Sequence, residues 1–380
     1  MAIILFLFLG MAAVVWLSVI GYVLYLRWKT PRFAKPDERP ASWPDIGVVI
    51  PVFNEEDLIL SKLSDITGVD YPRERLSIMV VDGNSTDKTV EYVRWAMAES
   101  ENIQLISLDG GRGKADQVSR ALNLLKQEIV VVTDADARWD SSCLKKLVAR
   151  LRSDPGAAIV AAAVEPQSSL LEERLHWLLL NTLWWLEGEA FGAASLSGVC
   201  YACRRSLVTS LSKTAKAEDI HLSLISGANG YGVRVCREAR VRELRVPQTL
   251  DEFFRFRRRR GTAYLAELLH PPRMARSTSG WRLARGMRLW HFLVTPKMAV
   301  LLLAFSLFLL ATSYRIGPIV IFAAFALPLL AALFSSSLRK EKNSWWRLPL
   351  AAGRYLALTL ASLLALSPRT RIQGPLGGKS

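Results

Sequence analysis

The chain has 380 residues, of which 51% are hydrophobic, and it carries a formal net charge of +15. This length allows one large domain or two modest ones, and the apolar content is high for a soluble protein. The sequence contains no zinc-finger spacing or basic zipper, and its arginines cluster just ahead of an apolar stretch. That placement excludes nucleic acid as the partner and favours anionic lipid headgroups or phosphate-bearing ligands.

The first predicted element is a transmembrane anchor over residues 1–27. Residues 2–26 are uncharged and form a run long enough to cross a bilayer. The run lacks the basic start of a cleaved signal peptide and ends in Arg27, Trp28 and Lys29, so we expect it to be retained. These basic residues place the following segment in the cytoplasm. A stiff proline-rich linker is predicted over residues 28–45.

Residues 46–248 are predicted to form a cytoplasmic α/β domain, because short apolar strands alternate with amphipathic helices. This alternation is typical of a parallel sheet with helices on both faces. The predicted strands are 46–52, 76–82, 102–108, 128–134 and 157–164, and the predicted helices are 56–67, 87–99, 114–126 and 141–152. The charged, Trp-rich stretch 169–195 is predicted to be a helix that either covers the sheet or lies at the membrane interface.

Acidic and amide side chains follow three of the predicted strands, where ligands of such sheets bind. They lie in IPVFNEE (50–56), in VVDGNSTDKT (80–89) and in VVVTDADA (130–137). Asp134 and Asp136 are two residues apart, so along a strand their side chains point to the same face and both can reach one metal ion. Carboxylates suit magnesium or manganese, which a diphosphate-linked ligand would require. The alternative is that these aspartates only cap the helices that follow.

Two further segments are candidates for binding or catalysis. GGRGKADQ (110–117) lacks the spacing of a nucleotide-binding P-loop, but its Lys114 opens a predicted helix and suits a nucleotide through its charge and the helix dipole. AEDIHLSL (217–224) places Glu218 and Asp219 at a helix start, either as a dipole-favoured acidic pair or as a general base kept ionised by the dipole. Cys200 and Cys203 are predicted to be small core residues rather than metal ligands.

The C-terminal third is predicted to return to the membrane. Residues 249–297 form an arginine-rich interfacial segment, in which WRLARGMRLWHF (281–292) mixes Arg and Trp ahead of a span. Residues 298–367 contain transmembrane helices, with spans at 298–314 and 316–334 and a third apolar run at 348–366. This last run either spans the bilayer or lies at its interface, with Arg354 reaching toward the headgroups. Residues 368–380 are a tail.

In chain order, VVIPVFNEE, VDGNSTD, GRGKADQVSRALN, TDADA, SGVCYACRR and AED resemble membrane-bound inverting glycosyltransferases of family two over residues 46–297. The resemblance implies a GT-A fold with a Rossmann-like mixed sheet, a nucleotide-sugar donor and a Mn²⁺ or Mg²⁺ ion. It implies that Asp82 reads the nucleotide base, that Asp134 and Asp136 bind the metal and that Asp219 is the catalytic base. The remaining donor contacts would be Pro51, Val52, Asn54, Glu55 and Lys114.

The likeness extends to the cellulose-synthase-like branch. HFLVTPK (291–297) resembles the gating segment of that branch, which places Phe292, Thr295 and Lys297 near the donor. In FFRFRRRRG (253–261), Phe256 and Arg260 replace the expected glutamine and tryptophan, while Arg259 keeps the arginine that faces the diphosphate. The missing tryptophan would stack on a growing sugar chain, so its absence argues against processive synthesis.

These features together predict an integral membrane enzyme that moves one sugar, with inversion, onto a lipid-linked acceptor of the polyprenol or dolichol type at the cytoplasmic face. GDP-mannose is favoured as the donor by resemblance to the mannosyltransferases of archaeal N-glycan assembly, and UDP-sugars remain open. The alternatives are a processive polysaccharide synthase, transfer to a lipid monophosphate, and a non-catalytic basic membrane protein.

Overall fold

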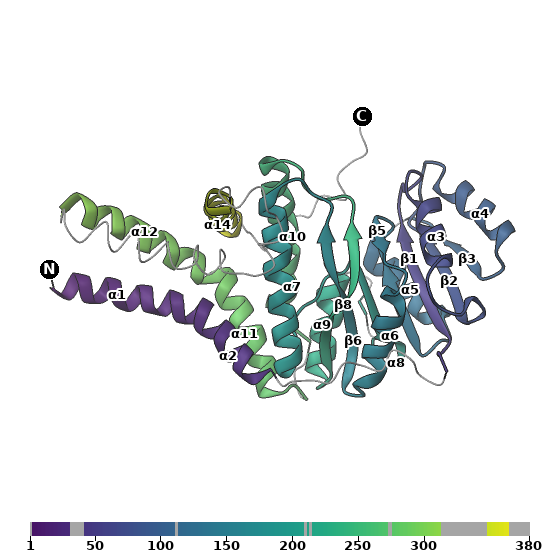
Figure 1. Cartoon of the computed structure of the whole chain (residues 1–380), viewed down its shortest axis with the longest axis horizontal. Helices are drawn as coiled ribbons and strands as arrows, with labels where there is room; N and C mark the ends of the chain where they lie inside the picture. The colour runs from purple at the N-terminus through teal and green to yellow at the C-terminus, as the bar shows by residue number, and fades with distance from the viewer. Residues whose placement is uncertain are drawn as a thin grey trace.

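The computed structural model describes residues 2–30, 42–110, 113–208, 211–212, 215–272, 276–312 and 348–364. Most of the predicted linker, the predicted span 316–334 with the polar segments beside it, and the tail 368–380 lie outside the described residues. An α/β domain occupies one side of the molecule, and two long helices extend together from its other side (Figure 1).

The first half of the sheet is parallel, as the alternation of strands and helices predicts. Its strands lie side by side in the order β3 (Ile103–Ser107), β2 (Leu76–Asp82), β1 (Ile46–Val52) and β4 (Ile129–Thr133). Every residue of β1 and β4 is buried, which explains why both strands are continuous apolar runs. The accompanying helices are α3 (Ile59–Thr67), α4 (Thr89–Glu99), α5 (Lys114–Leu124) and α6 (Cys143–Ser153).

The second half of the sheet is mixed. It contains β5 (Ala137–Trp139), β6 (Ala157–Pro166), β7 (Cys200–Arg204) and β8 (Gly232–Glu243). Strand β7 lies antiparallel between β4 and β6, and β5 pairs antiparallel with β8. The mixed sheet that the family resemblance implies is therefore confirmed, and the parallel sheet indicated by the alternation describes only the first half, because apolar periodicity reports a strand but not its direction. Cys200 and Cys203 are buried in β7, which confirms that they are core residues.

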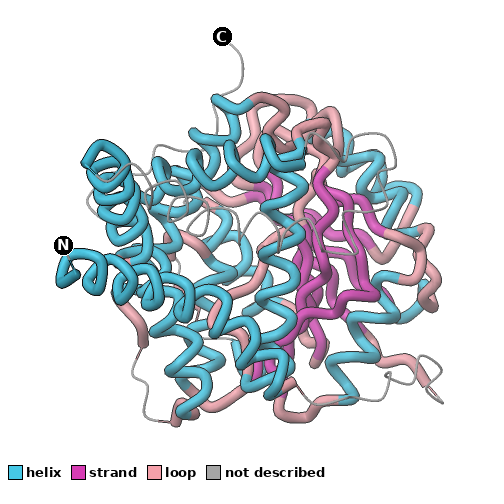
Figure 2. Tube along the Cα trace, turned by 60° about the vertical axis from the view of Figure 1, so that its left-hand side comes forward, coloured by secondary structure: helices cyan, strands magenta, loops and turns pink. Residues whose placement is uncertain are grey.

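Helix α7 (Leu171–Phe191) covers the mixed half of the sheet. Trp177 and Trp184 on this helix are 3% and 6% exposed and belong to the main hydrophobic core. They therefore do not anchor the helix in a membrane interface, and the sheet-covering alternative is correct. Figure 2 shows helices on both sides of the strands.

The apolar N-terminal stretch is helical over α1 (Ala2–Trp16), a π-helical turn (Leu17–Gly21) and α2 (Tyr22–Lys29). It lies beside α12 (Thr295–Thr312), and the rings of Phe8 and Phe305 stack at 5.5 Å between their centroids. Among the described residues, only Gly10–Lys29 is by itself long and apolar enough to cross a membrane. Helix α11 (Ser279–Leu293) and α12 would form a second span, bent by 43°.

Buried charges join these helices to the α/β domain. Arg288 of α11 pairs with Glu187 of α7 at 2.9 Å, and the hydroxyl of Tyr22 in α2 donates to the same carboxylate. Trp281 of α11 is 2% exposed. The expectation that residues 281–292 turn their Arg and Trp side chains to the membrane interface is therefore wrong for Trp281 and Arg288, which pack inside the protein.

Helix α14 (Leu348–Leu364) packs against α7 and α10 (Leu250–Leu269). Arg354 of α14 pairs with the fully buried Glu172 at 2.6 Å. The guanidinium of Arg354 therefore compensates a carboxylate inside the protein, while 45% of its side chain stays exposed, and its reach toward lipid headgroups stays a prediction. This pair fixes one edge of α14 to the α/β domain.

Candidate active site

The loops after β1 and β2 are held together by their polar side chains. Asn54, with φ of 55°, accepts a hydrogen bond from the backbone N–H of Thr86 at 2.8 Å. The backbone N–H of Asn54 in turn donates to the hydroxyl of Ser85. Pro51 and Val52 are buried at the end of β1, where Val52 pairs in register with Asp82. The structure therefore brings Pro51, Val52, Asn54 and Asp82, all predicted donor contacts, to one sheet edge.

Asp82 is 2% exposed, and its carboxylate accepts hydrogen bonds from the backbone N–H groups of Asn84 and Ser85. These contacts close the turn after β2. The side chain of Gln117 approaches the same turn and donates to the carbonyl groups of Val52 and Val81 at 2.7 and 2.8 Å. Gln117 thus holds the ends of β1 and β2 together, a role that its sequence position did not reveal.

Asp134 and Asp136 lie on the short turn between β4 and β5. Backbone hydrogen bonds fix this turn to two neighbouring loops: the N–H of Asp134 donates to Val199, and the N–H of Leu244 donates to the carbonyl of Asp136. No described residue gives the Asp136 carboxylate a hydrogen bond or an ion pair. Burial, and then the negative charges of Asp134 and Glu243, raise the pKa of Asp136 to about 6.

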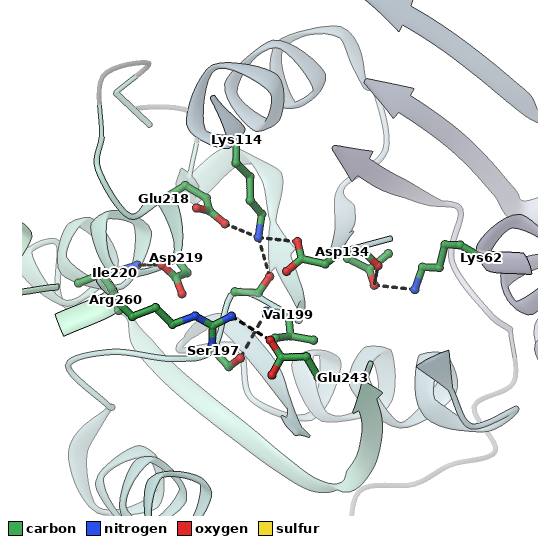
Figure 3. A network of polar contacts seen from close by, with 12 residues as sticks. Lys62, Lys114, Asp134, Ser197, Val199, Glu218, Asp219, Ile220, Glu243 and Arg260 are labelled. Atoms are coloured by element: carbon green, nitrogen blue, oxygen red, sulfur yellow. Dashed lines mark hydrogen bonds and ion pairs between the residues drawn. The ribbon is translucent and has the colours of Figure 1, made fainter. Parts of the chain in front are cut away.

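Lys114 bridges two acidic groups at the centre of the site (Figure 3). Its ammonium lies 2.7 Å from Asp134 and 2.7 Å from Glu218, and it donates to the carbonyl of Gly198 at 2.9 Å. Burial alone would lower the pKa of Lys114, but the surrounding carboxylates raise it above its ordinary value. Gly113, with φ of 91°, makes the turn into α5 that carries this lysine inward.

Asp219 lies in the first turn of α9 (Glu218–Ala228), across Lys114 from Asp134 in Figure 3. Burial, and then the charge of Glu218, raise the pKa of Asp219 to about 7, although Lys114 lowers it. The pKa of Asp219 is therefore higher than the helix dipole alone would give, because desolvation and a like charge outweigh the dipole. A Cβ at Gly198 would come within 2.9 Å of the Asp219 carboxylate, so only glycine fits there without displacing it.

Glu243 and Arg260 complete the charged cluster, and both were missed as site residues from the sequence. Glu243 ends β8, is 1% exposed and pairs with Arg260 of α10 at 2.8 Å. Its second carboxylate oxygen is buried without a hydrogen bond to any described residue. Arg260 also acts electrostatically on Asp136 and Asp219, lowering the pKa of each. The only sequence signal for Glu243 was an acidic residue at the end of a strand.

Glu55 extends the acidic cluster on the β1 side. Its carboxylate pairs with Arg245 at 2.8 Å. Burial raises the pKa of Glu55 to about 7, and Asp136 and Asp134 add to this shift while Arg245 opposes it. The loops after β1, β4 and β8 therefore share one electrostatic environment.

The predicted diphosphate and gating residues have other partners in the structure. The guanidinium of Arg259 lies over the Phe256 ring at 5.3 Å, while the neighbouring Arg260 reaches the carboxylates. Phe292 stacks on Tyr264 at 4.8 Å, and Tyr264 donates to Ser195. Thr295 begins α12 with a buried hydroxyl, and Lys297 is exposed. The donor contacts assigned to Arg259, Phe292, Thr295 and Lys297 stay predictions.

The charge balance at the turn suits a divalent cation. Asp134 raises the pKa of both Asp136 and Glu243, Glu243 adds to the shift of Asp136, and the buried second oxygen of Glu243 is unpaired among the described residues. The described residues contain no cluster of three or more His, Cys, Asp or Glu that could hold a metal. Magnesium sites of nucleotide-dependent enzymes commonly use one or two carboxylates together with the phosphates of the substrate.

Sequence comparison places these residues in a known context. The profile of glycosyl transferase family 2 matches residues 47–209, and that of glycosyl transferase family group 2 matches residues 129–336, more than half of the chain. The probable glycosyltransferase YdaM of Bacillus subtilis (strain 168) is 28% identical over 236 residues, 58% of this chain and 56% of that protein. A β-monoglucosyldiacylglycerol synthase of Nostoc sp. (strain PCC 7120) is 28% identical over 163 residues, 41% of this chain and 33% of the synthase.

The match therefore spans about half, or less, of the length of these curated relatives. Among solved structures, the mannosyltransferase PcManGT from Pyrobaculum calidifontis, in complex with GDP-Man and Mn²⁺, superimposes with a TM-score of 0.70. It is 24% identical, and the match covers 92% of this chain and 97% of that one. This likeness confirms the GT-A fold and its mixed sheet.

Proposed function

The chain belongs to glycosyl transferase family group 2, and on this basis we propose that it is a membrane-bound inverting enzyme that transfers one hexose from a nucleotide-sugar to a lipid-linked acceptor. The observation that carries this proposal is the position of the Lys114 ammonium, between Asp134 on one side and Glu218 with Asp219 on the other (Figure 3). The first side suits a metal-bound diphosphate, and the second suits an acceptor whose proton must be removed.

On the donor side, Asp134 and Asp136 would hold Mn²⁺ or Mg²⁺. When bound, the ion supplies Lewis-acid stabilisation of the leaving diphosphate. Lys114 and Arg260 place fixed positive charge beside the same carboxylates, and Arg259 remains the predicted additional contact. Fixed cations in a water-poor site stabilise charge that develops on the leaving group, which is the usual means of accelerating such a transfer.

On the acceptor side, Asp219 would take the proton of the attacking hydroxyl as the bond to the sugar forms. Inversion requires a single in-line displacement through a transition state with oxocarbenium character, and one base suffices for it. A pKa of about 7 suits this task, because a base is most effective when its pKa lies near the working pH.

The base role of Asp219 favours an uncharged hydroxyl as the acceptor. Burial and the charge of Glu218 raise the pKa of Asp219, although Lys114 and Arg260 lower it, so this carboxylate is suited to accept a proton. A lipid monophosphate is already ionised near neutral pH and needs no base, whereas a sugar or glycerol hydroxyl does. We therefore favour a lipid-linked sugar or a similar neutral headgroup, and transfer to a lipid monophosphate is the alternative.

Attachment to a membrane is part of the proposal. The apolar helix Gly10–Lys29 and the bent pair α11–α12 have the length and composition of membrane spans. Their buried contacts with α7, through Glu187 and Arg288, would hold the α/β domain against the cytoplasmic face. An acceptor with a lipid tail could then present its headgroup to the site while the tail stays in the bilayer.

The donor is tested by thermal unfolding of the purified protein with GDP-mannose and with UDP-sugars, each with Mn²⁺. A ligand that binds only the folded state raises the free energy of unfolding by RT ln(1 + [L]/Kd), about 2.7 kcal/mol at a concentration of 100 Kd. We expect GDP-mannose to raise the unfolding temperature most. A larger effect of a UDP-sugar would reassign the donor, and no stabilisation by any nucleotide-sugar would refute the transferase proposal.

We also expect transfer to be distributive. Arg260 stands where processive relatives are expected to have a tryptophan, and its guanidinium is committed to Glu243 and to the Phe256 ring at 4.2 Å. Position 260 itself therefore offers no tryptophan ring to a growing sugar chain. Mass spectrometry of the products at excess donor should show mainly a single added sugar, and a ladder of long products would contradict this prediction.

A further inference from the structure

A buried lysine lies beneath the turn that carries Asp134 and Asp136. Lys62 of α3 is 0% exposed, and its ammonium donates to the hydroxyl of Thr133 at 2.8 Å and to the carbonyl of Ala137 at 2.5 Å. The remaining side of the ammonium faces the ring of Trp139, 4.5 Å from its centroid. In Figure 3, Asp134 lies between Lys62 and Lys114.

This arrangement gives each side of the Lys62 ammonium a partner, two hydrogen-bond acceptors and one aromatic ring. An ammonium group has three donors, and here two point to oxygen atoms while the third side is covered by an aromatic face. The Thr133 hydroxyl also accepts from Trp139 Nε1 at 3.1 Å. Its own hydrogen is thereby directed toward the carbonyl of Asp134, 3.4 Å away. The contacts form a closed network in which each group has a defined partner.

The position is energetically costly for a charge. No carboxylate of the described residues lies within ion-pair distance of Lys62, and nearby Asp65 pairs instead with Arg138 at 2.9 Å. Burial lowers the pKa of Lys62 to about 8. Removing an ammonium from water without a charged partner carries a large desolvation penalty, so an apolar side chain of similar length would stabilise the fold more simply.

The two oxygen atoms that Lys62 binds lie on either side of the aspartate pair. Thr133 directly precedes Asp134, and Ala137 directly follows Asp136. The turn between them has backbone hydrogen bonds to Val199 and Leu244 and from Ala137 to Asp134. Among the described residues, Lys62 is the side chain that connects both ends of the turn, and it does so from the buried side.

We propose that Lys62 is a positioning residue for the cation site: by binding Thr133 and Ala137 together it holds the Asp134 and Asp136 carboxylates in the arrangement that receives the metal of the donor complex. The inference rests on the proposed function, since it assigns a metal to this turn. Residues that orient metal ligands without touching the metal commonly contribute about 10- to 100-fold in metal affinity or activity.

The test compares Lys62→Met with the wild type by calorimetric titration of Mn²⁺ in the presence of GDP, or of UDP if the wild type binds only UDP. We expect Mn²⁺ affinity to fall about tenfold or more. In transfer assays, the Mn²⁺ concentration for half-maximal rate should rise, while the rate at saturating Mn²⁺ largely recovers. If Lys62 serves only the core, Lys62→Met would change the unfolding temperature without changing either Mn²⁺ curve, and that result would overturn the proposal.

Lys145→Met is the matched control, because Lys145 also lies near a tryptophan ring, 5.4 Å from Trp43, but pairs with Asp70 away from the site. Its Mn²⁺ affinity should equal that of the wild type. If Lys62→Met does not fold, Thr133→Val removes one of the two hydrogen bonds of Lys62 with little change in volume and should weaken Mn²⁺ binding several-fold. Unchanged binding in that variant would refute the role of Lys62. A wild type that binds no Mn²⁺ with either nucleotide would instead refute the proposed function.

Discussion

Asp136→Asn is expected to abolish Mn²⁺-dependent sugar transfer while leaving the protein folded. The carboxylate of Asp136 has no hydrogen bond or ion pair with a described residue, and its pKa is raised by burial and by Asp134. Neutralising it therefore removes a group that the fold does not need and relieves like-charge repulsion. The variant should unfold at or above the wild-type temperature and should lose the stabilisation by nucleotide-sugar that requires Mn²⁺.

Asp140→Asn is the control for this variant, because Asp140 is an exposed aspartate just after β5. Its transfer rate and Mn²⁺ dependence should match those of the wild type. Full activity of Asp136→Asn, or transfer by the wild type that persists undiminished in EDTA, would show that the aspartate pair does not hold the required metal. Loss of folded protein in Asp136→Asn would contradict the argument that this carboxylate has no structural role.

Asp219→Asn is expected to lower turnover by on the order of a hundredfold or more, with donor affinity little changed. A sugar hydroxyl holds its proton far above neutral pH and needs a base as it attacks, and Asn cannot accept that proton. Lys114 keeps its ion pairs with Asp134 and Glu218 in this variant, so the donor side should remain intact. Turnover and GDP binding by calorimetry measure the two expectations separately.

The pH dependence gives the same assignment a second test. Because the pKa of Asp219 is raised to about 7, the base form is lost as the pH falls through that value, and kcat/KM should fall about tenfold per pH unit below it. Above pH 7 the dependence should level off. Asp219→Asn should lack this acidic limb. The groups that act electrostatically on Asp219 from its own and neighbouring elements are Glu218, Lys114, Arg260, Tyr201 and Tyr264.

Asp251→Asn is a matched control, since Asp251 also lies in the first turn of a helix but is exposed and paired with Arg255. It should retain wild-type turnover and the acidic limb. Near-normal turnover in Asp219→Asn with intact GDP binding would refute the base role. Because a phosphate is already ionised near neutral pH and needs no base, that outcome would favour a lipid monophosphate as the acceptor.

The sequence by itself determined the part of this protein that depends on local pattern. Strands β1, β2 and β4 lie within two residues of the predicted ranges, because buried parallel strands are unbroken apolar runs that end in polar residues. Since the carboxyl ends of parallel strands share one sheet edge, the meeting of Asp82, Asp134 and Asn54 at that edge followed from the same pattern. The order of the motifs identified the family.

The tertiary structure decided which charged groups face one another. Arg259 and Arg260 are neighbours in the sequence, but successive helical residues point about 100° apart, so only Arg260 reaches Glu243. The reversed direction of β7, the insertion of Lys62 beneath the aspartate turn and the raised pKa of Asp219 likewise depend on contacts between distant segments. Periodicity reports which side of an element is buried, whereas the partner of a buried charge is set by how the elements pack.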